Sequence, residues 1–364
     1  MAKAGVAAAV LAPFLMSAAS VFSITFKLRE VASALGASTL EVALAITLSF
    51  IGGAIGGVAL GALADAYGRR LGLFTSILVF SAAEALAGFA KSIWLLYAAW
   101  LSVGFGVNAE NGIAYAVIAE TWRGGRPGLI GGLTQGLYFI GMFLDAALSF
   151  LPWRLLLVLI GVASAATAPL ALLVPEGAGR RGKAPPLAEI FRGGLLAVTA
   201  LASALVAAAF MYTIPLATLA PDYLEEIGAE ALWRLALPLL GFAAFALAGW
   251  LSDIFGGGRV VMALAPIGLA SALALPLAGA LSAPDLAAAY FASSYFAYLG
   301  VWISELYPAE VRATATNFVF TLGRVMGGVG PALVAAAGLP WGLSLDLAAC
   351  SLAALISAAL LSRR

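Results

Sequence analysis

The stretch GALADAYGRR, residues 61–70, decides the fold of this chain. It places one acid and two arginines in a short turn, bounded by glycines, between two long apolar segments. A weaker copy, GWLSDIFGGGR, occupies residues 249–259. Asp65 of the first copy and Asp253 of the second are separated by about half of the 364 residues. A turn that repeats at half the chain length indicates a duplicated membrane protein, in which each half carries the turn after its second apolar segment.

The composition restricts the class of protein in the same direction. Hydrophobic residues make up 63% of the chain, charged residues make up 10%, and the mean hydropathy is +1.05. Such a chain cannot cover one core with a soluble surface. Crossing ~30 Å of hydrocarbon takes ~20 apolar residues, and runs of this length predict an all-α polytopic membrane protein with twelve transmembrane helices. The expected spans are residues 6–25, 40–64, 71–90, 93–119, 129–151, 155–174, 195–220, 232–251, 260–281, 286–303, 313–337 and 339–361.

A polar segment at residues 175–193 divides these spans into two sets of six. Its sequence, PEGAGRRGKAPPLAEIFRG, is rich in glycine, proline and charge, which predicts a mobile cytoplasmic linker. We therefore expect two pseudo-symmetric six-helix bundles, residues 1–174 and 194–364. Most of the 19 Lys and Arg residues fall on one side of the expected membrane, and cytoplasmic loops retain positive charge. Both termini are therefore expected in the cytoplasm of a plasma-membrane protein, with residues 1–23 as its first span rather than a secretory signal.

Other function classes find little support in the sequence. The chain has no histidine, which excludes a histidine proton relay and a histidine metal site. It shows no metal-ligand cluster or phosphate-binding loop, so no cofactor is expected and an embedded enzyme fits poorly. The net charge of +1 gives no sign of a nucleic-acid partner. We expect a monomer in the lipid bilayer, with the single cysteine, Cys350, as a packed apolar thiol.

Two loop signatures lie at the cytoplasmic ends of the expected spans. The first, G-x-x-x-D-x-x-G-R-R, is matched by Gly61, Asp65, Gly68, Arg69 and Arg70. The second, E-x-x-P-x-x-x-R, is matched by Glu305, Pro308 and Arg312, and a degenerate counterpart after the fourth span retains Glu120, Arg123 and Arg126. With these motifs and twelve spans the chain resembles the major facilitator superfamily, although Ala66 stands where the family often has arginine.

The second signature also indicates a branch of that family. ELYPAEVRAT, residues 305–314, is followed by the pair Gly323 and Arg324 and then by Gly330 and Pro331. This pattern is similar to the branch of proton symporters for aromatic acids, sialate and other organic acids. The resemblance implies a central substrate site and transport by alternating access.

The duplicated turn is expected to form a cytoplasmic gate. Asp65 ends a helix, where the macrodipole already places negative charge, so it needs a positive partner such as Arg69 or the amino end of another helix. The resemblance implies that this charge cluster holds one access state, and the alternative is a charge that only anchors the loop inside. We assign to the gate Gly61, Asp65, Gly68, Arg69, Arg70, Glu120, Arg123, Asp253, Arg259, Glu305 and Arg312. Gly53, Gly57 and Gly61 recur every four residues and predict a close helix contact, with Gly323 and Gly327 on span 11 to match.

Polar side chains inside the spans are the candidates for substrate binding. The chain has three asparagines and one glutamine, and all four fall in expected spans. Helical spacing gives spans 4, 5, 10 and 11 one polar or aromatic face each, and the four amides lie on those of spans 4, 5 and 11. The substrate-binding residues that we name are Arg324, Asn108, Asn111, Tyr115, Gln135, Tyr138, Asn317 and Tyr298. Hydrogen bonding between helices is the alternative role for the amides, and packing is the alternative for the aromatics.

A charged group near the middle of a membrane span costs free energy. Such groups therefore face protein or water. Arg324 and Glu110 lie nearest the middle and form the leading pair, with a structural ion pair as the alternative. Asp145 lies ~10 Å from the centre of its span, towards the outer side of the membrane. For Glu84 and Asp346, on peripheral helices, we expect local structural pairing.

Members of the organic-acid branch that this chain resembles commonly carry aspartates in the first span. This chain has Ser17 and Ser20 there. Proton coupling is therefore expected at Glu110 or Asp145, or else the carrier is uncoupled. The sequence as a whole predicts a secondary transporter, with a small organic anion held by Arg324 and taken up with a proton. The nearest alternative is a proton-driven drug or sugar carrier on the same fold, and a channel fits the duplicated turns less well.

Overall fold

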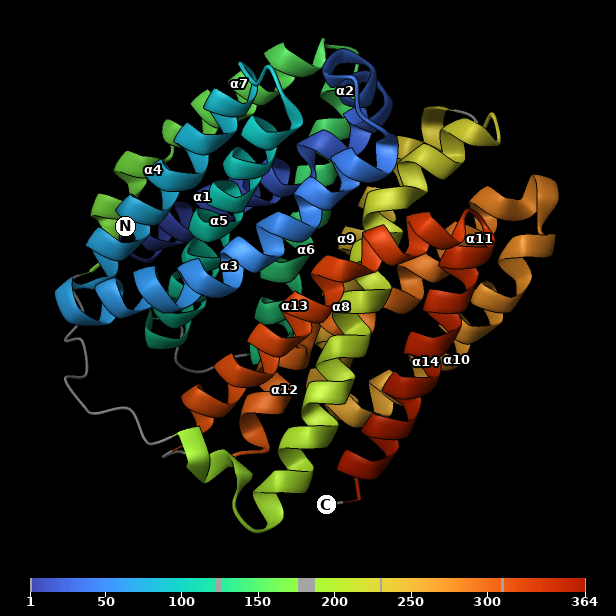
Figure 1. Ribbon diagram of the computed structural model, residues 1–364. Helices are drawn as coiled ribbons and strands as arrows, with labels where there is room; N and C mark the ends of the chain where they lie inside the picture. Colours follow the sequence, from blue (N-terminus) through green and yellow to red (C-terminus); the bar gives the residue numbers. More distant parts are fainter. Residues whose placement is uncertain (1, 122–125, 176–186, 230, 309–310, 364) are drawn as a thin grey trace. The chain divides into compact units, whose positions relative to one another are not determined.

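The computed structural model describes residues 2–121, 126–175, 187–229, 231–308 and 311–363 (Figure 1). These residues form α-helices and 3₁₀-helices, and no strand occurs among them. The helices are α1 (Ala2–Phe22), η1 (Ser23–Lys27), α2 (Leu28–Leu35), α3 (Thr39–Tyr67), α4 (Arg69–Ala87), α5 (Ile93–Thr121), α6 (Pro127–Leu148), α7 (Trp153–Ala165), η2 (Ala168–Leu173), η3 (Leu187–Phe191), α8 (Gly194–Glu226), α9 (Ala231–Phe255), α10 (Gly257–Ala274), η4 (Leu275–Leu277), η5 (Gly279–Leu281), α11 (Ser282–Ala292), η6 (Ser293–Tyr298), α12 (Leu299–Glu305), α13 (Arg312–Ala337) and α14 (Trp341–Leu361).

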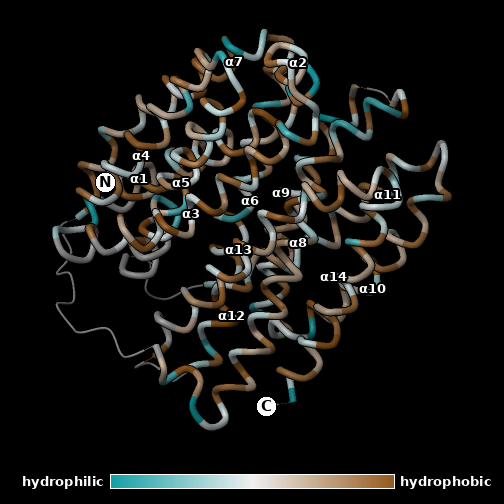
Figure 2. Tube along the Cα trace, in the orientation of Figure 1, coloured by the Kyte–Doolittle hydropathy of each residue, from teal (hydrophilic) through white to brown (hydrophobic). Residues whose placement is uncertain are grey.

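The described residues confirm an all-α polytopic membrane protein. Eleven helical segments among them are long and apolar enough to cross a membrane. The 29-residue helix α5 covers the additional span expected at residues 93–119. Figure 2 shows apolar residues along the length of the long helices.

The chain divides into two compact units. Unit 1 comprises Met1–Gly125 and Leu137–Gly182, and unit 2 comprises Arg126–Gly136 and Lys183–Arg364. The boundary therefore falls inside α6, whose amino-terminal part belongs to unit 2. The two six-helix bundles expected from the sequence, with their boundaries at residues 174 and 194, stay a prediction. Most of the expected linker, residues 176–186, lies outside the described residues.

Span 10 is not one regular helix, contrary to the face that helical spacing predicted for it. It consists of α11, the 3₁₀ segment η6 and α12. The hydroxyls of Ser293 and Ser294 donate to the carbonyl oxygens of Tyr290 and Phe291, each at 2.7 Å. Serine hydroxyls that bind nearby carbonyls compete with regular helical hydrogen bonds, and a 3₁₀ turn has three residues per turn instead of 3.6. Tyr295 and Tyr298 therefore lie in line with each other, but residues before and after η6 do not continue their face at the spacing of a regular helix.

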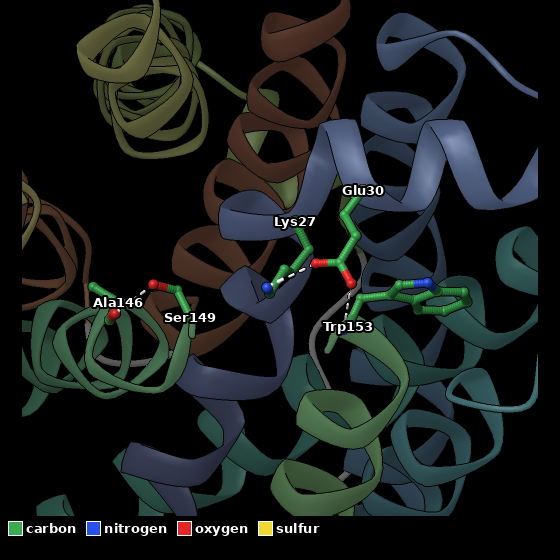
Figure 3. Close-up of polar contacts among 5 residues, drawn as sticks. All are labelled: Lys27, Glu30, Ala146, Ser149 and Trp153. Atoms are coloured by element: carbon green, nitrogen blue, oxygen red, sulfur yellow. Dashed lines mark hydrogen bonds and ion pairs between the residues drawn. The ribbon is translucent and has the colours of Figure 1, made fainter. Parts of the chain in front are cut away.

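The first span also ends differently from the expectation. After Phe22 the chain continues through η1 into the short helix α2. Lys27 is buried, and its Nζ lies 2.8 Å from Glu30 Oε2 (Figure 3). The other carboxylate oxygen of Glu30 accepts a hydrogen bond of 3.0 Å from the backbone N–H of Trp153, at the start of α7. This ion pair fixes the end of the first span against α7 within unit 1.

Glycines bring α3 and α5 into backbone contact. A Cβ built on Gly52 or Gly56 would overlap the carbonyl oxygen of Leu101 or Phe105, while Gly57 and Gly61 meet nothing within 4 Å. A Cβ on Gly104 would overlap the Ser49 carbonyl oxygen. Close packing through small residues is typical of membrane helices. The close contact predicted for Gly53, Gly57 and Gly61 with Gly323 and Gly327 of span 11 stays a prediction, because α3 and α13 belong to different units.

In unit 2 the glycines of α13 pack against α8. A Cβ on Gly323 would lie 2.7 Å from a side-chain carbon of Val206, and one on Gly327 would lie 2.6 Å from Phe210 Cβ. These glycines therefore set the distance between α13 and α8, and through it the position of Arg324 on α13.

Candidate substrate site and cytoplasmic gate

The amide of Asn111 joins three helices of unit 1. Its Nδ2 donates to the hydroxyl of Tyr138 on α6, and its Oδ1 lies 3.2 Å from the hydroxyl of Ser17 on α1. Asn111 is buried, with 2% of its surface exposed. The Tyr138 ring lies edge-on against Phe14 and Phe22 of α1, at 5.5 and 6.1 Å between ring centroids. The structure thus brings two of the predicted substrate residues together, and Ser17 joins them.

Asn108 lies one helical turn before Asn111 on α5 and is also buried. Its Nδ2 donates to the carbonyl of Gly104 at 3.4 Å. A Cβ on Gly53 of α3 would overlap this amide. Gly53 therefore makes the space that Asn108 occupies, a role that its glycine spacing did not reveal.

Two buried acids lie in the same unit. Glu110 on α5 and Asp145 on α6 have no exposed surface. Among the described residues, none of their four carboxyl oxygens has a hydrogen-bond partner. Glu110 lies beside the hydroxyl of Ser17. These carboxyl groups are removed from water, and burial of this kind disfavours the charged form of a carboxyl group.

Three of the remaining predicted substrate residues belong to unit 2. Arg324 on α13 and Gln135 on α6 are partly exposed, and each makes an interaction. Tyr298 in η6 is 1% exposed, and its hydroxyl donates to the carbonyl of Gly257 at 3.0 Å. That bond favours the packing role for Tyr298. Because Glu110 belongs to unit 1, its pairing with Arg324 stays a prediction.

Some residues of the predicted site have side chains that the structure does not describe. The helical backbone is described at Tyr115, Asn317, Asp65, Glu120 and Arg312, but their side chains are not. Arg123 lies outside the described residues. Their assigned roles stay predictions.

Asp253, the acid of the second turn, binds the amino end of α6. Its Oδ1 accepts from the backbone N–H of Gly128 at 2.8 Å, and its Oδ2 accepts from that of Leu129 at 2.9 Å. The first N–H groups of a helix have no partner within it and carry the positive end of the dipole. Both oxygens of the carboxylate therefore satisfy a helix terminus, which is the kind of partner expected for the acid of this turn.

Small residues permit that contact between α9 and α6. A Cβ on Gly249 would overlap the carbonyl oxygen of Gly128, and one on Gly132 would overlap the carbonyl oxygen of Phe245. The conspicuous glycines around Asp253 thus hold two backbones close enough for the acid to reach the helix end.

The basic residues of the turns cap helix ends as well. Arg70 donates through Nε and Nη2 to the carbonyl of Val174, at 3.3 and 3.2 Å, directly after η2. Arg259 donates to the carbonyl of Phe255 at the end of α9, at 3.4 Å. A cation at the carboxyl end of a helix is favourable. Arg69 makes an interaction, Gly61 and Gly68 are partly exposed, and Glu305 is exposed at the end of α12.

The two turns and the helices around them can be compared with known protein families. The sequence profile of the Major Facilitator Superfamily matches residues 8–331. The chain belongs to the major facilitator superfamily. A probable 4-methylmuconolactone transporter of Cupriavidus pinatubonensis is 28% identical over 80% of this chain and 74% of its own. The sialic acid transporter NanX of Escherichia coli is 33% identical over 24% of this chain and 22% of its own.

A solved superfamily structure agrees with the fold. The crystal structure of a D-xylose-proton symporter matches with a TM-score of 0.76, covering 99% of this chain and 97% of that one. At 15% identity this match shows the fold alone. The family and its relatives establish that this superfamily member is a secondary transporter and not an enzyme.

We predict that Asp253→Ala releases the amino end of α6. The change removes both acceptors of a helix cap, and the loss of such a cap destabilises the helix end by about 1 kcal/mol. It also removes a negative charge at the positive end of the helix dipole, which adds ~0.3–1 kcal/mol to this loss. A loss of ~1.4 kcal/mol shifts an equilibrium about tenfold. Maleimide labelling of a cysteine introduced by Ile130→Cys in a Cys350→Ser background should therefore become faster.

The control is Glu226→Ala, which removes an exposed acid at the end of α8. It should leave the labelling rate at the parent value. Equal rates in Asp253→Ala and Glu226→Ala would contradict a gating role for the acid and favour the anchoring alternative.

Proposed function

We propose that this transporter is a proton-coupled symporter of a small organic anion and works by alternating access. The observation that carries the anion assignment is Arg324. It is the one charged residue of the span Phe318–Ala337, in a helix whose glycines pack closely on α8. An arginine at this depth is costly unless it faces protein, water or a counterion. A carboxylate substrate supplies that counterion, and the planar guanidinium binds it through two hydrogen bonds.

Buried and half-buried polar groups would complete the recognition of such a substrate. The buried Asn111 and the half-buried Tyr138 form a pair in unit 1, and Gln135 lies on the unit 2 part of α6. Amides and a tyrosine hydroxyl both donate and accept hydrogen bonds, so they suit the hydroxyl or carbonyl groups of an organic acid. The relatives named as transporting sialic acid and 4-methylmuconolactone support this substrate class.

The two acidic turns would act as cytoplasmic gates. Asp253 already binds a helix end, and Asp65 is its counterpart in the first half of the sequence. We place both termini in the cytoplasm and the protein in the plasma membrane as a monomer. Each half would rock as one bundle, with residues 1–174 and 194–364 as the moving bodies.

A binding screen of the purified protein tests the substrate class. Thermal unfolding is measured with sialic acid, muconate and hydroxybenzoate, and also with xylose and the cation tetraphenylphosphonium. A ligand that binds only the folded state raises its stability by ~2.7 kcal/mol at a hundredfold excess over Kd. Stabilisation by carboxylates alone is the expected result. Stabilisation only by xylose or by the cation would reassign the protein as a sugar or drug carrier.

A further inference from the structure

Glu84 on α4 lies in a group of oxygen atoms inside unit 1. The hydroxyl of Ser23 in η1 donates to Glu84 Oε1 at 2.7 Å, and it also lies 3.4 Å from the backbone carbonyl oxygen of Ser20 on α1. Ser20 Oγ in turn lies 3.4 Å from Ser164 Oγ on α7. All four residues have no exposed surface. We call Glu84, Ser20, Ser23 and Ser164 the Glu84 cluster, which combines one carboxyl group, three hydroxyls and a main-chain carbonyl.

Close packing of three helices holds the Glu84 cluster together. Helices α1, α4 and α7 contact one another. A Cβ on Gly161 of α7 would lie 2.5 Å from the backbone nitrogen of Ala85 on α4. Ala85 directly follows Glu84, and Gly161 lies less than one helical turn before Ser164. Backbones in contact beside the cluster fix the positions of its oxygen atoms, as small residues do between membrane helices.

The basic side chains near this end of the helices have other partners. Lys27 pairs with Glu30 at 2.8 Å. The guanidinium of Arg154 on α7 donates to two backbone carbonyl oxygens, at 3.0 and 2.8 Å. The fully buried charged residues on α5 and α6, Glu110 and Asp145, are acids and supply no positive charge. Among the described residues, the carboxyl group of Glu84 therefore makes no ion pair.

One carboxyl oxygen of Glu84 is left over. Its Oε2 is buried and has no hydrogen-bond partner among the described residues. A buried carboxylate needs a positive partner, or it takes up a proton. A proton on either oxygen would still leave Oε2 without a partner, whereas a metal ion can contact both oxygens of a carboxylate. Carboxylate and carbonyl oxygens are the ligands of hard metal ions, and each serine hydroxyl offers two further lone pairs.

We propose that the Glu84 cluster binds a sodium ion. One carboxylate balances a single positive charge, which favours a monovalent ion. The oxygen contacts within the cluster measure 2.7 to 3.4 Å, and a small cluster of this kind selects ions by size. The bound ion would join α1, η1, α4 and α7 through its ligands and so stabilise unit 1. This inference is independent of the proposed proton symport and of the organic anion.

Thermal unfolding of the full-length protein in detergent tests the site. The Tm is measured at constant pH and ionic strength with sodium chloride, potassium chloride or choline chloride. An ion that binds only the folded state makes the Tm depend on its concentration, so Na⁺ should raise the Tm until the site is saturated. K⁺ and choline should leave the Tm unchanged. Glu84→Gln and Ser23→Ala should lose the rise with Na⁺, because each removes a ligand.

Two control variants should keep the rise with Na⁺. Ser76→Ala changes a buried serine of α4 whose hydroxyl donates to the carbonyl of Gly72 in the same helix, at 2.7 Å. Asp346→Asn changes a half-buried acid of unit 2. A Tm that does not respond to Na⁺ in the wild type, or a full response in both Glu84→Gln and Ser23→Ala, would overturn the proposal.

A second measurement uses only the wild-type protein, in case the variants fold poorly. Dicyclohexylcarbodiimide reacts with protonated carboxyl groups in apolar surroundings, so an ion on the carboxylate protects it. Peptide mass spectrometry should find slower labelling of Glu84 in Na⁺ than in choline at the same pH. Equal labelling of Glu84 in the two salts, including none in either, would contradict the sodium site. Labelling that depends on pH alone would assign a proton to Glu84 instead.

Discussion

Replacing Arg324 with alanine is expected to abolish carboxylate binding and carboxylate uptake. Hydrogen bonds to a charged partner contribute ~1.5–3 kcal/mol each, so loss of a two-point contact lowers affinity at least about a hundredfold. Arg324→Lys should recover little, because a lysine ammonium is a point charge and cannot reproduce the planar fork. Binding of sialic acid, muconate and hydroxybenzoate is measured by calorimetry on the purified variants.

The matched control for this change is Arg192→Ala. Arg192 is an exposed arginine between η3 and α8, outside the membrane spans, so its loss should leave the affinity at the parent value. Full carboxylate affinity in a folded Arg324→Ala protein would refute the anion assignment.

Gly104→Ala is expected to cause the largest loss of stability, because it separates α3 from α5. A Cβ at this position would overlap the carbonyl oxygen of Ser49, and a backbone group cannot move aside like the end of a flexible side chain. Overpacking of a well-packed interior costs ~1–3 kcal/mol where neighbours can adjust, and here the helices themselves must move. The variant should show reduced recovery of monomer in detergent and a lower Tm.

Gly112→Ala provides the control within the same helix. A Cβ on Gly112 meets nothing within 4 Å, and alanine favours the helix over glycine by ~1 kcal/mol. Its Tm should equal or exceed that of the parent. Equal Tm values for Gly104→Ala and Gly112→Ala would show that α3 and α5 are not in backbone contact.

The sequence was sufficient for the class of fold because the membrane imposes it. Long apolar runs must become helices in a bilayer, where each backbone group needs a partner. The breaks in the helices were not predictable in this way. The 3₁₀ segment η6 interrupts span 10, and helical spacing carries no information about where such a segment begins.

The candidate site was predicted where it depends on one helix face and missed where it depends on contacts between helices. Asn111 and Tyr138 are each placed by spacing along their own helices. Ser17 was noted only as a position where related proteins carry an acid, yet it contacts Asn111. Glu84 was expected to pair locally, and the hydroxyl of Ser23 in η1 donates to it at 2.7 Å, a contact between helices that no local pattern encodes. A buried acid beside serines of another span is the signal that could have indicated this cluster.

The most direct test of the central claim is counterflow in proteoliposomes. Vesicles loaded with unlabelled sialic acid, muconate or hydroxybenzoate are diluted into medium with a trace of the same labelled compound, with no ion gradient present. A carrier that alternates between two access states exchanges internal for external substrate, so labelled carboxylate should transiently accumulate above its equilibrium level, and Arg324→Ala should remove this overshoot. Uptake that rises only to equilibrium, or an overshoot seen with xylose but with no carboxylate, would contradict an alternating-access carrier of organic anions.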